Sequence, residues 1–103
     1  MSARRLFYLA AAQAEVREAF EWYFERSLEA AARFLTELDR ATLLIRETPT
    51  VWPSFGRGTR KYVLQGFPYS VIYREVGDEL QVVAVAHGKR KPGYWRSRTA
   101  GQR

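Results

Sequence analysis

The sequence contains no cysteine, which excludes a disulfide framework and a thiolate metal site. It has a single histidine, His87, and its second half has no cluster of Asp and Glu, so metal chemistry has little support. A nucleophilic triad and a glycine-rich phosphate loop are also missing, because Gly56-Arg57-Gly58 lacks a lysine and a following helix. We therefore expect no cofactor, no metal and no small-molecule substrate.

Long apolar runs are absent as well. No stretch approaches the roughly 18 consecutive apolar residues of a membrane-spanning helix. Arg4 and Arg5 are followed by only a short apolar segment before Gln13 and Glu15, which does not fit a signal peptide. With 103 residues the chain has room for one domain. We expect a soluble, cytoplasmic protein that has no contact with a membrane.

Acidic residues become scarce in the second half of the chain. Residues 1–50 carry seven Lys/Arg and eight Asp/Glu, a net charge of −1, whereas residues 51–103 carry ten and three, a net charge of +7. Such a charge can simply keep a small domain soluble. Because the asymmetry is regional, it favours a polyanion or an acidic protein surface as partner.

The first half of the chain predicts one strand and two helices. Residues 6–9 are a short apolar, β-prone run, and from about Ala11 apolar side chains recur at three- and four-residue steps, with glutamates such as Glu15 falling elsewhere. Ser27 suits the N-cap of a second helix. This helix is expected to stop at Thr48-Pro49, because proline disfavours helical geometry in the residue before it. The two helices form an antiparallel hairpin.

The second half predicts three antiparallel strands, at about 60–65, 69–76 and 79–87. Gly77-Asp78 fits a two-residue type II′ turn, whose first residue needs a positive φ. The order β-α-α-β-β-β indicates an α+β domain, residues 1–95, in which the helical hairpin packs on one face of a mainly antiparallel sheet with the first strand at an edge. Residues 96–103 form a basic tail with no pattern that predicts order.

The last strand is apolar on both faces, although two helices can cover only one face of the sheet. Leu80, Val82, Ala84 and Ala86 are expected to alternate with Val83 and Val85. Either the loop that contains Trp52 covers the second face, or a protein partner does, since an uncovered apolar patch usually marks an interaction site.

Four segments resemble the RelE/ParE superfamily of type II toxin–antitoxin toxins. They are Phe-Glu-Trp-Tyr-Phe-Glu-Arg-Ser (20–27), Arg-Phe-Leu (33–35), Phe-Pro-Tyr-Ser-Val-Ile-Tyr-Arg (67–74) and Val-Ala-His-Gly-Lys-Arg-Lys-Pro-Gly-Tyr-Trp (85–95). The similarity extends over roughly residues 5–96. It implies a growth-inhibiting toxin, of a kind linked to plasmid stabilization, that is neutralised by a cognate antitoxin whose C-terminal segment wraps the toxin surface.

The superfamily implies two alternative activities. RelE-like members cut mRNA in the ribosome with basic residues and a C-terminal tyrosine, and Lys61, Arg90 and Tyr94 resemble parts of that set. Val63 and Ser70, however, stand where such enzymes carry a lysine and an arginine. The chain therefore resembles the ParE-like members, which inhibit DNA gyrase and are not known as nucleases.

Candidate site residues follow from these alternatives. For a nuclease, the catalytic candidates are Lys61, His87, Arg90 and Tyr94. His87 has a reference pKa that suits an acid or a base, but a strand-end histidine bonded to the backbone is the simpler interpretation. Tyr94 and Trp95 can stack on bases or fix the chain end to the core.

The basic residues suggest two binding surfaces. Target binding is expected at Arg60, Lys61, Lys89, Arg90 and Lys91, and acidic residues of the antitoxin are expected near Arg60, Arg74 and Arg90. A third alternative is a non-toxic basic domain that binds nucleic acid.

Overall fold

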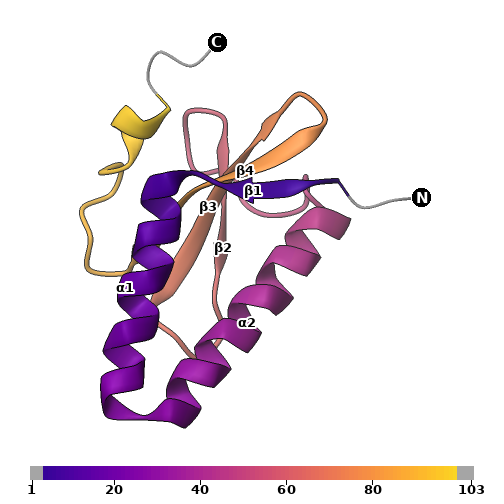
Figure 1. Cartoon of the computed structure of the whole chain (residues 1–103). Helices are drawn as coiled ribbons and strands as arrows, with labels where there is room; N and C mark the ends of the chain where they lie inside the picture. The colour runs from indigo at the N-terminus through magenta and orange to yellow at the C-terminus, as the bar shows by residue number, and fades with distance from the viewer. Residues whose placement is uncertain (1–3, 100–103) are drawn as a thin grey trace.

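The structure, a computed structural model, describes residues 4–99. Its elements are β1 (Leu6–Tyr8), α1 (Ala10–Arg26), α2 (Leu28–Glu47), β2 (Thr59–Val63), β3 (Tyr69–Val76), β4 (Glu79–His87) and a short 3-10 helix, η1 (Arg96–Arg98). In Figure 1, α1 and α2 form a V that is joined at its lower end, and the sheet lies behind them. The predicted element order and the α+β class are confirmed.

The helical hairpin turns at Ser27. The extended backbone of this residue (φ −165°, ψ 115°) ends α1, and its Oγ accepts a hydrogen bond from the Ala30 N–H at 3.1 Å, which caps α2. α2 ends at Glu47, and Thr48 leaves helical geometry ahead of Pro49. Both predicted helix boundaries are confirmed.

One sheet contains the four strands in the order β1-β4-β3-β2. The β2–β3 and β3–β4 pairs are antiparallel, and β1 pairs with β4 in parallel at the edge. Gly77 has a φ of 60°, as the first residue of a type II′ turn requires. The three-strand meander and the edge position of β1 are confirmed, while β2 lies slightly earlier in the chain than the predicted 60–65.

Both helices pack on the same face of the sheet. The core on this side is formed by fully buried side chains from α2 and the strands. Its largest members are Phe34, Ile45, Val71, Tyr73, Leu80, Val82 and Val85. The prediction that the hairpin covers one face is confirmed.

The opposite face is covered by the C-terminal segment of the chain itself. Trp95 is 2% exposed and packs with Ile72, Val83 and Ala84. Phe55, from the loop between α2 and β2, lies against the indole with ring centroids 6.1 Å apart. The interpretation of Trp95 as an anchor of the chain end is confirmed.

Trp52 itself does not cover the second face, although the loop that contains it contributes to the cover through Phe55. Trp52 packs edge-on against Tyr62, with ring centroids 4.7 Å apart, in the helix-side core. Only Phe55 of this loop reaches the second face. The sequence could not show this, because both aromatic side chains are equally suited to burial.

A β-bulge in β4 changes which side chains share a face. Ile72 pairs with Ala84 but Tyr73 pairs with Val82, so Val83 is an extra residue. As a result, Val82 belongs to the helix-side core while Val83 and Ala84 both belong to the opposite core. The expected regular alternation along β4 is therefore wrong.

Residues 96–99, which belong to the tail that has no pattern predicting order, are structured by contacts with the rest of the chain. Residues 96–98 form η1, and the Arg98 guanidinium donates to Glu15 of α1. The remaining tail residues lie outside the described residues.

Candidate target-binding site

The site is built at the outer edge of β4, where β1 ends. The last contact of the β1 segment with this edge is the Leu9 N–H, which donates to the Val82 carbonyl at 3.0 Å. Beyond it, the Val85 N–H donates to Glu15 Oε1 at 2.9 Å, and Arg98 Nη1 donates to the Val83 carbonyl at 3.1 Å. Side chains from α1 and from the C-terminal segment thus take the place of a neighbouring strand.

Glu15 is the centre of this arrangement. Besides the Val85 N–H, its carboxylate accepts the Tyr94 hydroxyl at 2.6 Å and two Arg98 nitrogens at 2.9 Å each. Its side chain is only 11% exposed. Burial on its own would raise the pKa of Glu15, but the hydrogen bonds from Arg98, Tyr94 and Val85 and the charge of Arg98 outweigh it and hold the pKa below its usual value.

Two guanidinium groups lie close to the Tyr94 ring. The Arg90 guanidinium carbon is 3.7 Å from the centre of the Tyr94 ring, and that of Arg98 is 5.1 Å away. Burial and the hydrogen bond to the Glu15 carboxylate raise the pKa of Tyr94 well above its usual value, although the two arginines oppose the rise. The hydroxyl therefore stays protonated and keeps donating to Glu15.

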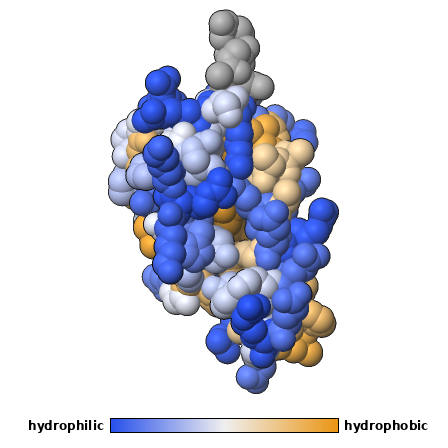
Figure 2. Space-filling view, turned by 90° about the vertical axis from the view of Figure 1, so that its left-hand side faces the viewer, coloured by the Kyte–Doolittle hydropathy of each residue, from blue (hydrophilic) through white to orange (hydrophobic). Residues whose placement is uncertain are grey.

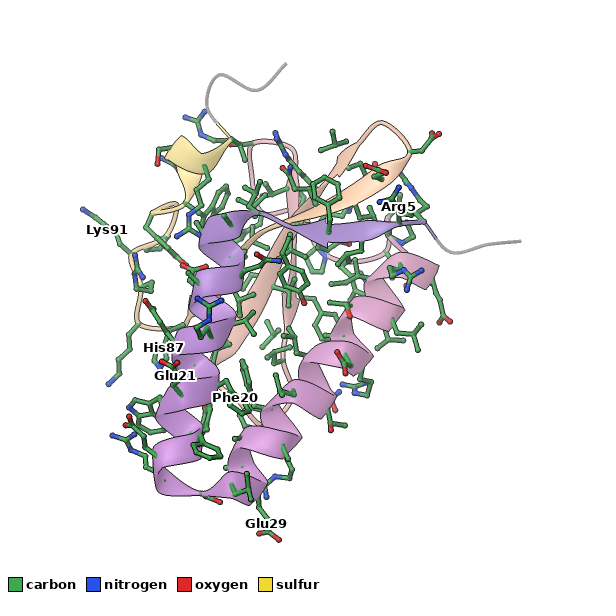
Figure 3. The ribbon with its side chains drawn as sticks, in the orientation of Figure 1. Arg5, Phe20, Glu21, Glu29, His87 and Lys91 are labelled. Carbon is green, nitrogen blue, oxygen red and sulfur yellow. The ribbon has the colours of Figure 1, made fainter. Side chains whose placement is uncertain are left out.

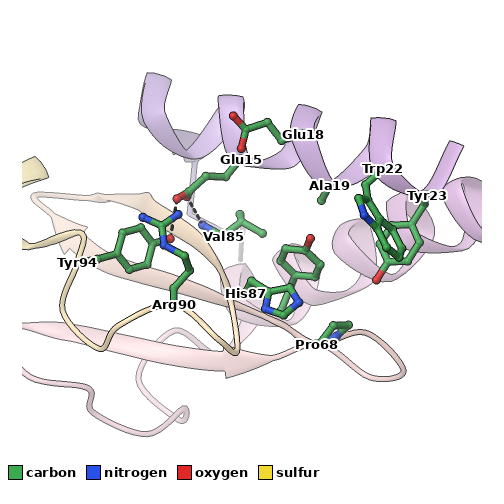
Figure 4. A pocket seen from close by; sticks show the side chains of 11 residues that line it. Glu15, Glu18, Ala19, Trp22, Tyr23, Pro68, Val85, His87, Arg90 and Tyr94 are labelled. Atoms are coloured by element: carbon green, nitrogen blue, oxygen red, sulfur yellow. Dashed lines mark hydrogen bonds between the residues drawn. The ribbon is translucent and has the colours of Figure 1, made fainter. Parts of the chain in front are cut away.

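A pocket of about 370 Å³ opens between α1 and the end of β4. Figure 4 shows Glu15 and Arg90 at one end of it and the aromatic side chains of α1 at the other. Its lining includes Trp22, Tyr23, Tyr69, His87, Arg90 and Tyr94. The pocket thus combines an apolar, aromatic wall with two glutamates, Glu15 and Glu18, and one arginine.

A smaller pocket of about 100 Å³ lies on the other side of Arg90. The candidate nuclease residues Lys61, His87, Arg90 and Tyr94 all line it, together with Ser70 and Lys91. The structure therefore brings together the four side chains that the sequence proposed as catalytic.

Two of these side chains have local partners. The Lys89 N–H donates to His87 Nδ1 at 3.0 Å, so the histidine is bonded to the backbone at the end of the strand, as the simpler interpretation held. The Lys61 ammonium lies 4.6 Å from the centre of the Phe55 ring. Each contact restrains one side of the small pocket.

Arg60 and Arg74 lie elsewhere, so the structure does not bring all three expected antitoxin contacts together. They line a depression of about 130 Å³ at β2 and β3, and Arg60 donates to the Trp52 carbonyl at 2.7 Å while Arg74 donates to the Gln81 side chain at 2.8 Å. Along β3, Arg74 is four residues from Ser70 of the small pocket, about 13 Å at the usual rise per residue. Arg90 belongs to a different surface.

The basic segment after β4 is exposed. Lys89, Arg90 and Lys91 are all accessible, and Figure 3 shows Lys91 pointing away from the body of the protein. Figure 2 faces the side that carries α1 and the C-terminal segment, and it shows mainly hydrophilic side chains with apolar surface between and below them. This side has the exposure that the expected target-binding surface requires.

Sequence reasoning missed Glu15 and Arg98. Glu15 falls outside the apolar positions of α1 and was expected among its solvated glutamates, and Arg98 lies in the expected tail. Both bind backbone groups at the edge of β4 that β1 leaves unpaired, and the extent of this edge depends on where β1 stops. No local signal in the sequence marks that point.

A fourth hollow, of about 460 Å³ and wide open to solvent, lies between the two helices. Its lining is mostly apolar and comes from β1, α1 and α2: Tyr8, Gln13, Val16, Arg17, Phe20, Leu35 and Leu38. Leu35 is exposed although it is large and apolar. We refer to this hollow as the interhelical groove.

Other classes of site find no support in residues 4–99. There, no group of three or more His, Asp or Glu side chains is placed to hold a metal ion. Within the same residues, no helix has both the length and the apolar character to cross a membrane.

A helical hairpin over an antiparallel sheet, with a basic segment after the last strand, defines a small α+β protein of the RelE/ParE type. The family model described as "ParE toxin of type II toxin-antitoxin system, parDE" matches residues 6–92. The chain therefore belongs to the ParE toxin family, and the resemblance inferred from the sequence is confirmed.

A solved structure supports the fold. It is described as "Chromosomal ParDE TA system from P. aeruginosa", and its chain superposes with a TM-score of 0.72 at 19% identity, covering 82% of this chain and 96% of that chain. At this identity the likeness concerns the fold. No curated protein matches the chain.

Proposed function

We propose that this toxin arrests growth in the cytoplasm by binding DNA gyrase, without nuclease chemistry, and that a cognate antitoxin neutralises it. The observation that carries the proposal is the pairing of Val63 with Ser70 across β2 and β3. These are the two positions where the resemblance to RelE-like enzymes requires positive charge. A neutral pair at this place offers no positive charge to stabilise the developing charge on a scissile phosphate.

The contacts of Tyr94 also favour binding over cleavage. Its hydroxyl donates to Glu15, and its raised pKa makes it a poor proton donor or acceptor near neutral pH. The charge that remains available lies on Lys89, Arg90 and Lys91, which are exposed. We assign target binding to this basic segment, with Lys61 as a less accessible neighbour, while Arg60 lies in the separate depression at β2 and β3.

The alternative activity, ribosome-dependent mRNA cleavage, rests on one observation. Lys61, His87, Arg90 and Tyr94 line the same small pocket. Against it stand the neutral pair Val63–Ser70 and the engaged hydroxyl of Tyr94. Membership in a toxin family leaves the third alternative, a non-toxic basic domain, without support.

For the antitoxin, the interhelical groove offers the apolar surface and the second half of the chain offers the charge. Tyr8, Val16 and Leu35 line the groove, and residues 51–103 carry a net charge of +7. A disordered acidic segment with apolar side chains would gain binding free energy from the apolar groove and from the positive charge, and it would lose conformational entropy as it becomes ordered. Because Arg60 and Arg74 already donate to groups within the chain, Arg90 is the more accessible of the three expected contacts.

The test is a supercoiling assay with purified gyrase, run in parallel with a translating extract programmed with a defined mRNA. We expect loss of supercoiling, relieved by the antitoxin, and intact mRNA. Rapid mRNA cleavage in phase with codons, together with unaffected gyrase, would replace the proposal by the nuclease alternative.

A further inference from the structure

We infer that Glu15 is a positioning residue, which holds the Arg90 guanidinium in place for its target by fixing the Tyr94 ring. The inference rests on the proposed function in one respect only, namely that Arg90 contacts the target. The positioning itself is a property of the toxin alone and can be measured without any partner.

Arg90 has one side-chain contact that can restrain it. It lies in an exposed segment between β4 and Trp95, and among residues 4–99 its guanidinium forms neither a hydrogen bond nor an ion pair. Its guanidinium is stacked on the Tyr94 ring at 3.7 Å. A free arginine at this place would lose side-chain entropy on binding, and a stacked one has already lost part of it.

The Tyr94 ring is held at its far end by Glu15. The hydroxyl-to-carboxylate distance is 2.6 Å, and Glu15 is itself fixed by the Val85 N–H of β4 and by Arg98. A series of short contacts therefore connects the rigid edge of the sheet to an exposed cation. Arg90 also lies between the two pockets of the site, so its position affects both.

The chain supplies a matched control for the carboxylate. Glu37 of α2 has the same kinds of partner, because it accepts from Arg40 and from the Gln65 N–H at 2.7 Å. The Arg40 guanidinium also donates to a tyrosine, Tyr62, at 3.0 Å. Glu37→Gln thus removes an equivalent buried charge away from Arg90.

The chain also supplies a reference stack. The Arg26 guanidinium lies 3.8 Å from the centre of the Trp22 ring, at the far end of α1. This pair resembles the Arg90–Tyr94 stack in distance, and its arginine is held by the Trp22 carbonyl at 2.7 Å and by Glu25 at 3.7 Å, not by Glu15. Its signals should be unaffected by any change at Glu15.

The first measurement is NMR on the free toxin. In the wild type we expect upfield-shifted Arg90 side-chain protons and a rigid Arg90 Nε–H. Glu15→Gln should weaken both signatures, because the neutral amide no longer pairs with Arg98. The Arg26 signals should stay unchanged in this variant. In the Glu37→Gln variant, the Arg90 signals should stay as they are in the wild type. Tyr94→Phe keeps the ring but removes its hydroxyl, and should also mobilise Arg90. Unchanged Arg90 signals in folded Glu15→Gln or Tyr94→Phe protein would overturn the inference.

The second measurement is a double-mutant cycle with gyrase affinity as readout. We expect Glu15→Gln to weaken gyrase binding about tenfold in the wild type and to have no further effect in the Arg90→Ala background. Equal losses in both backgrounds would mean that Glu15 acts by general stability and not through Arg90. A wild-type toxin that does not bind gyrase would overturn the proposed function alone, and the NMR result would still decide the positioning role.

Discussion

Arg98 donates from both terminal nitrogens of its guanidinium to the carboxylate of Glu15, a residue 83 positions earlier in the chain. The pair is largely shielded, with Arg98 20% and Glu15 11% exposed. The pair joins the C-terminal segment to α1, and the buried side chain of Trp95 joins the same segment to the sheet. The basic segment between β4 and Trp95 is thereby held at both ends.

Arg98→Ala should lower the free energy of unfolding by about 2 kcal/mol, because it leaves the Glu15 carboxylate partly buried without its cation. For a domain of this size, that corresponds to a fall in the thermal midpoint on the order of 10 °C. Thermal unfolding followed by circular dichroism measures it. The control is Arg5→Ala, since Arg5 is 82% exposed in its pair with Glu79 and should change stability by less than about 0.5 kcal/mol.

Stability should fall in acid because of two glutamates. The pKa of both Glu15 and Glu37 is held below its usual value of 4.5, since hydrogen bonds from arginine and from the backbone outweigh the effect of burial. A lowered folded-state pKa contributes stability that is present above the unfolded pKa and is lost as the pH falls through the folded one. Urea unfolding at a series of pH values from neutral to below 4 should show this loss. A Glu15→Gln variant with the same pH dependence as the wild type would contradict it.

Arg90→Ala and Lys91→Ala should each abolish or sharply weaken growth arrest while leaving the thermal midpoint within a few degrees, as exposed substitutions usually do. Induced expression without antitoxin, scored by colony formation, gives the readout. Arg26→Ala removes another exposed arginine from an aromatic ring and should stay toxic. Full toxicity of both basic-segment variants would show that this segment only keeps the protein soluble.

Trp95→Ala should lower stability by roughly 3 kcal/mol or more, because it removes a large buried side chain from the core opposite the helices. Trp22→Ala is the matched control, since that indole is 51% exposed. Urea unfolding at neutral pH compares the two. Equal effects would mean that the C-terminal segment contributes little to the core.

His87→Ala separates the two mechanisms. A nuclease that uses His87 as acid or base should lose orders of magnitude in mRNA cleavage, whereas a gyrase-binding toxin should lose little inhibition. The supercoiling assay and the translating extract give the two readouts. Strong loss of gyrase inhibition in folded protein would indicate that the histidine itself contacts the target.

Local chemistry predicted most of the fold. The cap at Ser27, the stop before Pro49 and the turn at Gly77 depend on the conformations that these residues favour, so their positions can be read from the sequence. The bulge at Val83 could not be predicted, because valine and alanine suit either face of a strand. Whether a face is buried depends on the whole fold.

The site was predictable only in part. Lys61, Arg90 and Tyr94 were proposed from their resemblance to a family and His87 from its acid–base chemistry, and the structure places all four around one pocket. Glu15 escaped notice, since a glutamate outside the apolar face of an amphipathic helix is normally solvated. Its partners come from β4, from η1 and from the segment between them, and contacts at that separation leave no local pattern.

The parallel pairing of β1 with β4 has a consequence for how the protein is made. Leu6 pairs with Leu80, so β1 can join the sheet only after β4 has been synthesised. Glu15 can form its contacts with Arg98 only after η1 has been synthesised as well. The α1–α2 hairpin can form early from local contacts, but the sheet and the stacked Arg90 can be completed only after β4 and η1 have been synthesised. The basic surface of the toxin is therefore completed in a later step of folding than the helical hairpin.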